Sequence, residues 1–240
     1  MQNNKCKMLT FSYDDGVTQD VRLISLLNKY GIKGTFNINS ELLGLEGHLV
    51  REGVHINHTK VNASDVRNIY EGHEIAAHTL THPFLPDIED DAEIIRQVEY
   101  DRLRLSELAG YEVVGFAYPG GGTNFNRRVA DVIKRGTGIK YCRTTVSSYG
   151  FDPEPDLFCF RPSLYHHGDW EKLYSYAEEF VNLRCQTQKM LYIWGHAYEF
   201  DINNSWERFE ELLRFLSGRE DIFYGTNREC ILDSNYTKEI

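Results

Sequence analysis

The 240-residue sequence lacks the long apolar runs that a membrane-spanning segment needs. A transmembrane helix takes about 20 consecutive apolar residues, and no run in this chain reaches even about 18. Met1 to Lys5 are not followed by the apolar region of a secretory signal. We therefore expect a cytoplasmic protein that has no membrane partner, unless a signal has been removed from the sequence.

Cysteines are few and form no pattern. The five are Cys6, Cys142, Cys159, Cys185 and Cys230, and no two of them make a Cys-x-x-Cys pair. An odd number at wide spacing favours reduced thiols over a disulfide framework. The same spacing argues against a zinc site built from thiolates.

Positive charge is also scarce. Lys and Arg number 26 against 36 Asp and Glu, which gives a formal net charge of -10 at pH 7. Proteins that bind nucleic acids neutralise phosphates with basic residues, so this balance argues against a nucleic-acid partner. The sequence has no composition break, internal repeat or low-complexity segment. We therefore treat residues 1–240 as a single domain.

The chain does have a regular alternation of β-prone and helical stretches. Apolar residues at helical spacing predict helices over 18–30, 62–70, 87–109, 125–134, 169–181 and 206–216. Clusters of β-branched and aromatic residues predict strands over 9–13, 34–39, 74–77, 113–118, 141–146, 157–160, 190–194 and 222–224. Residues 40–62 fit neither pattern.

This alternation is typical of an α/β fold with parallel strands joined by crossover helices. A (β/α) barrel and an open doubly wound sheet both fit it. No Gly-x-Gly-x-x-Gly follows an early strand, which weakens the nucleotide-binding version of the open sheet.

The segment Leu9 to Gly16 reads as a strand that ends in two acids and a glycine. Asp14 and Asp15 should therefore lie at the carboxyl end of a strand, where α/β enzymes place their chemistry. Adjacent carboxylates repel each other and need different partners. One can bind a metal while the other acts as a base. A lone Asp-Asp-Gly is more often a solvated turn, so the assignment depends on residues further along the chain.

Three histidines supply that support. His78 and His82 follow the predicted strand 74–77 and are four residues apart. Together with Asp15 they offer two imidazoles and a carboxylate, and such three-ligand sets are typical of hydrolytic metal sites with an open position. His196 follows the strand 190–194, which makes it a candidate general acid beside such a site.

Five segments, in order, resemble the motifs of the polysaccharide deacetylases, the NodB-homology or carbohydrate esterase family 4 group. They are Thr10 to Gly16, His78-x-x-x-His82, Pro119-Gly120-Gly121, Asp169-Trp170 and Leu191-x-Ile193-x-x-His196. The first, second and fifth are specific, and the third and fourth are degraded. The resemblance spans residues 8–200. It implies a distorted (β/α) barrel with about seven parallel strands and removal of acetyl groups from sugars.

The resemblance implies a role for each matching residue. Asp14 would be the general base, and His196 would be the general acid, oriented by Asp169. A divalent ion, which we expect to be zinc, would be held by Asp15, His78 and His82.

The substrate would be held by other residues of the motifs. The backbone N–H of Gly120 would donate to the oxyanion of the transition state. Trp170 and Leu191 would form the wall around the acetyl methyl group.

The sequence also departs from the family pattern. The family has an arginine two residues before the proline of the third motif, paired with the base, and this chain has Ala117. We expect Arg161 to reach Asp14 instead, and Arg143 is a second candidate. His166 replaces the first acid of the fourth motif, and Glu199 follows His196 closely enough to line the site.

Three functions are compatible with these residues. The leading one is a metal-dependent deacetylase that removes N- or O-linked acetyl groups from a saccharide. The second is hydrolysis of a small non-sugar amide, which relatives of this fold also perform. The third is a carbohydrate-binding homologue without catalysis, which the retention of both acids, all three ligands and His196 disfavours.

Overall fold

The computed structural model describes residues 5–233. Its main sheet consists of β1 (Lys7–Asp14), β2 (Gly34–Ile38), β5 (Glu74–Ala77), β6 (Gly115–Ala117), β7 (Tyr141–Arg143), β8 (Leu164–Tyr165), β9 (Lys189–His196) and β10 (Ile222–Tyr224). The strand order is β7-β6-β5-β2-β1-β9-β8, and β10 pairs with the first residues of β1. Every pairing within this sheet is parallel.

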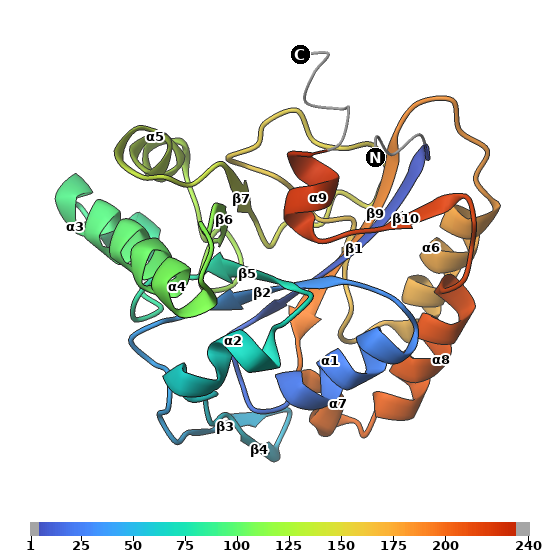
Figure 1. The fold of residues 1–240 in the computed structure, drawn as a ribbon, viewed down its shortest axis with the longest axis horizontal. Helices are drawn as coiled ribbons and strands as arrows, with labels where there is room; N and C mark the ends of the chain where they lie inside the picture. The colour runs from blue at the N-terminus through green and yellow to red at the C-terminus, as the bar shows by residue number, and fades with distance from the viewer. Residues whose placement is uncertain (1–4, 234–240) are drawn as a thin grey trace.

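The sheet curls until its two edges approach each other. Phe160 forms a parallel bridge with Arg143 on β7 and lies four residues before Leu164, where β8 begins. Two backbone hydrogen bonds of 2.9 Å join Phe160 to Cys142 and Thr144. The predicted distorted (β/α) barrel with about seven parallel strands is confirmed, and Figure 1 shows the curled sheet at the centre of the molecule.

Helices cover the outside of the sheet (Figure 1). They are α1 (Asp20–Lys29), α2 (Val66–Ile69), α3 (Asp91–Ile95), α4 (Asp101–Ala109), α5 (Arg127–Gly136), α6 (Trp170–Asn182), α7 (Glu199–Ile202), α8 (Trp206–Leu216) and α9 (Asn227–Ile231). A π-helical turn, Arg96–Tyr100, joins α3 to α4. Within residues 5–233, no helix has both the length and the apolar character required to cross a bilayer.

The unassigned region forms a β-hairpin outside the main sheet, at the bottom of Figure 1. Its strands β3 (His48–Arg51) and β4 (Val54–Asn57) are antiparallel. Glu52 and Gly53 connect them with φ angles of 53° and 78°. Positive φ at both central residues is the signature of the two-residue turns that suit the twist of a hairpin. The predicted strand 157–160 is wrong, because only Phe160 pairs there and the strand forms later, as β8.

Alternation along β1 decides which side chains enter the barrel. The rings of Phe11 and Tyr13 pack against Phe209 on α8, with ring centroids 5.9 and 6.3 Å apart. Successive residues of a strand point to opposite faces, so Thr10 and Asp14 face the barrel interior. All four β1 residues are buried. The period of two therefore carries Asp14 to the inner surface at the carboxyl end of the strand.

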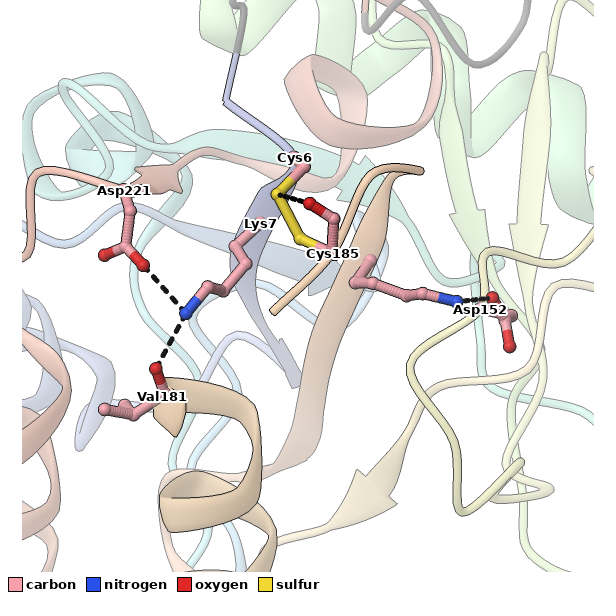
Figure 2. Close-up of a disulfide and its surroundings, with 7 residues drawn as sticks. Cys6, Lys7, Asp152, Val181, Cys185 and Asp221 are labelled. Carbon is pink, nitrogen blue, oxygen red and sulfur yellow. Dashed lines mark hydrogen bonds and ion pairs between the residues drawn. A yellow bond between two sulfur atoms is a disulfide. The ribbon is translucent and has the colours of Figure 1, made fainter. Parts of the chain in front are cut away.

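The opposite end of β1 carries a disulfide between Cys6 and Cys185, shown in Figure 2. The expectation of reduced thiols is therefore wrong for this pair, while Cys142, Cys159 and Cys230 are free. The physical reason is the register of the sheet. Lys7 on β1 pairs with Lys189 on β9, and the backbone N–H of Lys189 donates a 2.7 Å hydrogen bond to the carbonyl of Cys6. The segment that leads into β9, which contains Cys185, therefore lies beside Cys6.

Candidate metal centre and catalytic cavity

A cavity of about 470 Å³ opens at the carboxyl ends of the strands. Six of the residues selected from the sequence line it: Asp14, Asp15, His78, His82, Gly120 and His196. These residues come from the ends of four strands that are spread along the chain. Parallel strands bring their carboxyl ends to one edge, which explains why residues so distant in sequence share one cavity.

Three of these residues form a compact ligand set. One ligand atom from each of Asp15, His78 and His82 lies within 4.8 Å of the other two. The Oδ1 atom of Asp15 is 3.8 Å from Nε2 of His82. One carboxylate and two imidazoles make a donor set suited to zinc and to other divalent transition metals.

The surroundings of His78 prepare it as a ligand. Its Nδ1 lies 2.8 Å from the carbonyl oxygen of Ala117. A carbonyl oxygen only accepts, so Nδ1 carries the proton and Nε2 keeps a free lone pair. Burial lowers the pKa of His78 to about 4, so the ring is neutral near pH 7, as a ligand must be. These observations fit a metal at this position.

The backbone at the ligands is unusual. Asp15, Thr79 and His82 have φ angles of 84°, 68° and 61°, in the left-handed region that side chains other than glycine rarely adopt. Thr79 supports this turn, because its hydroxyl accepts a 3.0 Å hydrogen bond from the backbone N–H of His82. Backbone strain of this kind clusters at functional sites, where the surrounding structure fixes it.

Two side chains that the sequence analysis did not select surround Asp15. Nε2 of His58 lies 3.1 Å from Oδ2, and the ammonium of Lys60 lies 3.6 Å from Oδ1. Burial alone would raise the pKa of Asp15, but the His58 hydrogen bond and the Lys60 charge outweigh it and hold the pKa well below its usual range. Asp15 is therefore ionised and available as a ligand.

Asp14 is buried at the end of β1, lines the cavity and is held by partners other than those of Asp15. Nη2 of Arg143 lies 2.7 Å from its Oδ1 and 2.5 Å from its Oδ2. Asn37 on β2 donates a further 2.7 Å hydrogen bond to Oδ1. Both side chains are buried, and the Arg143 guanidinium also stacks 4.4 Å from the ring centroid of Trp194. The two adjacent acids thus have separate partners, as their mutual repulsion requires.

The prediction that Arg161 reaches Asp14 is wrong. Arg161 is half exposed, and its guanidinium pairs with Glu154 at 2.7 Å. It follows Phe160, where the chain leaves its bridge with β7. The second candidate, Arg143, supplies the cation because it lies on β7 itself.

His196 lies beside Asp14, since these two residues are register partners on β9 and β1. Its Nε2 is 4.0 Å from Oδ2 of Asp14, and its Nδ1 is 3.1 Å from Oε1 of Glu199. Burial acts to lower the pKa of His196, but the charges of Glu199, Asp15 and Asp14 outweigh it and raise the pKa to about 9.

Glu199 is buried at the start of α7 and contacts several polar groups. It accepts hydrogen bonds from the backbone N–H of His196 at 2.9 Å and from the Tyr165 hydroxyl, and its Oε2 lies 2.8 Å from Nε2 of His166. His166 in turn packs closely on Gly195, where a Cβ atom would come within 1.9 Å of the imidazole. His166, which replaces the first acid of the fourth motif, is therefore a partner of Glu199, the acid that contacts His196.

Asp169 occupies a different position from the one expected. Its Oδ1 accepts a 2.9 Å hydrogen bond from the backbone N–H of Lys172, so it caps the N-terminus of α6. Among residues 5–233, no hydrogen bond or ion pair joins it to His196, whose nearby carboxylate is Glu199. The predicted orienting contact is therefore wrong.

Two predicted wall residues also lie outside the cavity lining. Trp170 packs on the outer helices. The centroid of its ring is 6.3 Å from that of Tyr174, and the guanidinium of Arg208 lies over the ring. Leu191 is a fully buried residue of β9 in the hydrophobic core, paired with Leu9. The apolar lining consists instead of Tyr165, Trp194, Tyr198 and Val146.

Gly120 does line the cavity, at a φ of 83°. Asn124, which is fully buried, holds this loop with hydrogen bonds of 2.7 Å to the carbonyl of Tyr118 and 2.9 Å to that of Gly120. A side chain at this glycine would be strained by the backbone and would lie 3.2 Å from the ring of Phe84. The loop therefore requires glycine at this position.

Some residues that line the cavity or hold its side chains were missed from the sequence. Asn37 follows two positions after Thr35 on the inward face of β2, and the period of two could have identified it. Trp194 could have been found by the same rule, because it lies two residues before His196. Arg51 had only a weak signal, the Glu-Gly pair between β-prone residues that marks a hairpin turn.

Solved structures share this fold. A family 4 acetyl xylan esterase from Clostridium thermocellum, in complex with a cobalt ion, has a TM-score of 0.58 at 15% identity, covering 97% of this chain and 92% of that chain. A Xyl-CE4 domain of a multidomain xylanase from the hindgut metagenome of Trinervitermes trinervoides has a TM-score of 0.60 at 14% identity, covering 99% and 93%. The PuuE allantoinase has a TM-score of 0.66 at 13% identity, covering 94% and 89%. At these identities the likeness is one of fold.

No curated protein matches the sequence. The family model for polysaccharide deacetylase matches residues 1–141, which is more than half of the chain. This segment contains both acids of the first motif, the candidate ligands His78 and His82, and the Gly120 loop. The chain therefore belongs to the polysaccharide deacetylase family.

Proposed function

We propose that this protein is a metal-dependent hydrolase that removes acetyl groups, N- or O-linked, from a saccharide. The proposal rests on one observation: three candidate metal ligands, the Asp14 carboxylate and the His196 imidazole line the same cavity. Asp15, His78 and His82 are close enough to hold a divalent ion, which we expect to be zinc. When bound, this ion supplies positive charge that polarises the acetyl carbonyl and makes water more acidic. The cobalt ion of the related esterase supports a divalent metal.

Asp14 acts as the general base in this proposal. It removes a proton from the water that attacks the acetyl carbon, and Arg143 and Asn37 fix its carboxylate for that transfer. Arg143 also places a positive charge beside this carboxylate. Gly120 contributes its backbone N–H to the oxyanion, a contact typically worth about 2.7–4 kcal/mol in the transition state.

His196 acts as the general acid. As the bond between the acetyl carbon and the sugar nitrogen or oxygen breaks, Nε2 donates a proton to the leaving atom, so the products are acetate and a free amino or hydroxyl group. Glu199 lies 3.1 Å from Nδ1 on the other side of the ring and stabilises the protonated form. Such a donor contributes about 10²–10⁴-fold to a rate.

The proposal is tested by acetate release from acetylated saccharides. The metal-stripped protein should be inactive, addition of zinc should restore activity, and His78→Ala should stay inactive because it cannot hold the ion. An Arg161→Ala control, altered far from the ligands, should behave as wild type. Acetate release that is equal in stripped and zinc-loaded protein would contradict the proposal.

A second candidate is hydrolysis of a small non-sugar amide. The observation in its favour is the likeness to an allantoinase, at a TM-score of 0.66. The same catalytic residues would serve, because attack of water on an amide carbonyl is common to both reactions. Turnover of small cyclic amides, with no acetate released from any acetylated saccharide, would favour this function.

A further inference from the structure

One cation in the cavity forms no close ion pair. Arg51 lies at the end of β3, and it lines the cavity together with Asp14 and Asp15. Among residues 5–233, no carboxylate oxygen lies within 4.0 Å of its guanidinium. Its interactions include a hydrogen bond with the Tyr198 hydroxyl and a longer-range attraction to the charge of Glu199. Most exposed arginines are simply solvated, so a binding role for Arg51 depends on the charges and contacts around it.

The acids of the cavity are already neutralised by other cations. Arg143 binds Asp14 at 2.5 Å, and Lys60 lies 3.6 Å from Asp15, which is also the carboxylate of the metal set. Arg51 is therefore not needed to balance the catalytic carboxylates. In a chain with a net charge of -10, it offers a local positive charge to a bound molecule.

The hairpin that carries Arg51 is fixed to the barrel on both sides. Next to Arg51 at the tip, Glu52 pairs with His167, which follows β8, at 2.9 Å. At the other end of the hairpin, Gln19 donates a 2.7 Å hydrogen bond to the carbonyl of Asn57. These contacts hold the arginine at the cavity and limit the ordering that binding would require.

We propose that Arg51 binds an anionic group of the substrate, so that the protein acts on acetylated saccharides that carry a carboxylate or a phosphate. This inference rests on the proposed deacetylase function. A guanidinium donates two parallel hydrogen bonds to either anion, which makes it specific as well as attractive. A neutral acetylated chain would place no anion opposite this positive charge.

The test compares three saccharides that differ at one position: a neutral N-acetylated disaccharide, the same disaccharide with a carboxylate ether, and the same disaccharide with a phosphate. Binding is measured by calorimetry in zinc-loaded His196→Gln, which keeps Asp14, Arg143 and the ligands but is impaired in turnover. Arg51→Ala, Arg51→Lys and the control Arg161→Ala are made in that background.

We expect at least one anionic disaccharide to bind about 10-fold more tightly than the neutral one. Arg51→Ala should remove that preference, Arg51→Lys should retain part of it, and Arg161→Ala should leave it unchanged. The disaccharide that binds more tightly shows whether Arg51 recognises a carboxylate or a phosphate. Raising the salt concentration should reduce the preference, because the cation is solvent-accessible.

Equal binding of all three disaccharides, a preference that survives in Arg51→Ala, or no binding of either anion would overturn the inference. Acetate release by the unmodified protein is measured separately. If the neutral substrate is deacetylated without any preference for the anions, the inference about Arg51 fails and the proposed function stands. If the anions bind through Arg51 but no acetate is released, the proposed function fails.

Discussion

Arg143 on β7 and Asp14 on β1 meet inside the barrel, with Nη2 of the guanidinium 2.7 and 2.5 Å from the two carboxylate oxygens. Arg143 is the register partner of Ala117 on β6, the position where the family resemblance places an arginine. Register partners on neighbouring parallel strands point the same way. Relative to the family pattern, the cation therefore lies on the neighbouring strand at the same level of the sheet.

Replacement of Arg143 should weaken the base. In Arg143→Met the Asp14 carboxylate loses the guanidinium that fixes its orientation, so acetate release should slow while the zinc content stays unchanged. Arg143→Lys should lose less activity, because it keeps the positive charge but not the guanidinium geometry. The measurements are the rate of acetate release and the zinc content, and wild-type rates in both variants would show that Arg143 has no role in positioning the base.

Glu199 should control the protonation of His196. The pKa of His196 is raised to about 9, mainly by the Glu199 charge acting against burial. Glu199→Gln removes that charge, so the pKa of His196 should fall and the ring should lose its proton at lower pH. NMR titration of the imidazole in metal-free protein measures this directly. A titration that stays at the wild-type pH would exclude Glu199 as its partner.

His73 should make stability depend on pH. Its Nδ1 accepts a 3.1 Å hydrogen bond from the backbone N–H of Gly34, and burial lowers its pKa from 6.5 to about 4. Between these values the unfolded chain binds more protons than the folded one, so this contribution to stability is present above 6.5 and is lost as the pH falls toward 4. Urea unfolding of metal-free protein at about pH 7, 5.5 and 4.5 should therefore show a flatter dependence in His73→Gln. An equally steep dependence in that variant would show that other groups cause it.

The disulfide should stabilise the barrel. It joins residues 179 apart in sequence, and the adjacent Lys7 ammonium is bound by Asp221 and by the carbonyl of Val181, each at 2.7 Å (Figure 2). Linking such distant residues restricts the unfolded chain, and disulfides typically contribute about 2–4 kcal/mol. Cys185→Ser should lower the thermal midpoint under oxidising conditions, whereas the control Cys159→Ser, at a free thiol, should change it less. Equal midpoints for Cys185→Ser and the non-reduced wild type would contradict a structural role.

The sequence was sufficient where one local pattern decided the structure. The periodicity of the strands and helices predicted the parallel α/β arrangement, and Asp14, Asp15, His78, His82 and His196 could be found because each follows a β-prone run. Side chains at strand ends converge by topology alone, so no knowledge of packing was required.

The sequence was insufficient where the answer depends on packing between distant segments. Arg161 and Arg143 both lie near strand ends, and only the bridge between Phe160 and β7 shows which of them faces the cavity. The position of Asp169 in the sequence fits both a helix cap and a partner of His196, and the structure shows that it caps α6. The pairing of Cys6 with Cys185 depends on the register of β1 and β9, which spacing along the chain does not reveal.

Asp14→Asn separates the proposed base from the proposed metal ligands. The substitution leaves Asp15, His78 and His82 in place, so zinc content by elemental analysis should match that of the wild type. The rate of acetate release should fall at least about 100-fold, the low end of what general acid–base catalysis contributes. A variant that keeps both its zinc and near-wild-type turnover would contradict the assignment of Asp14 as the base.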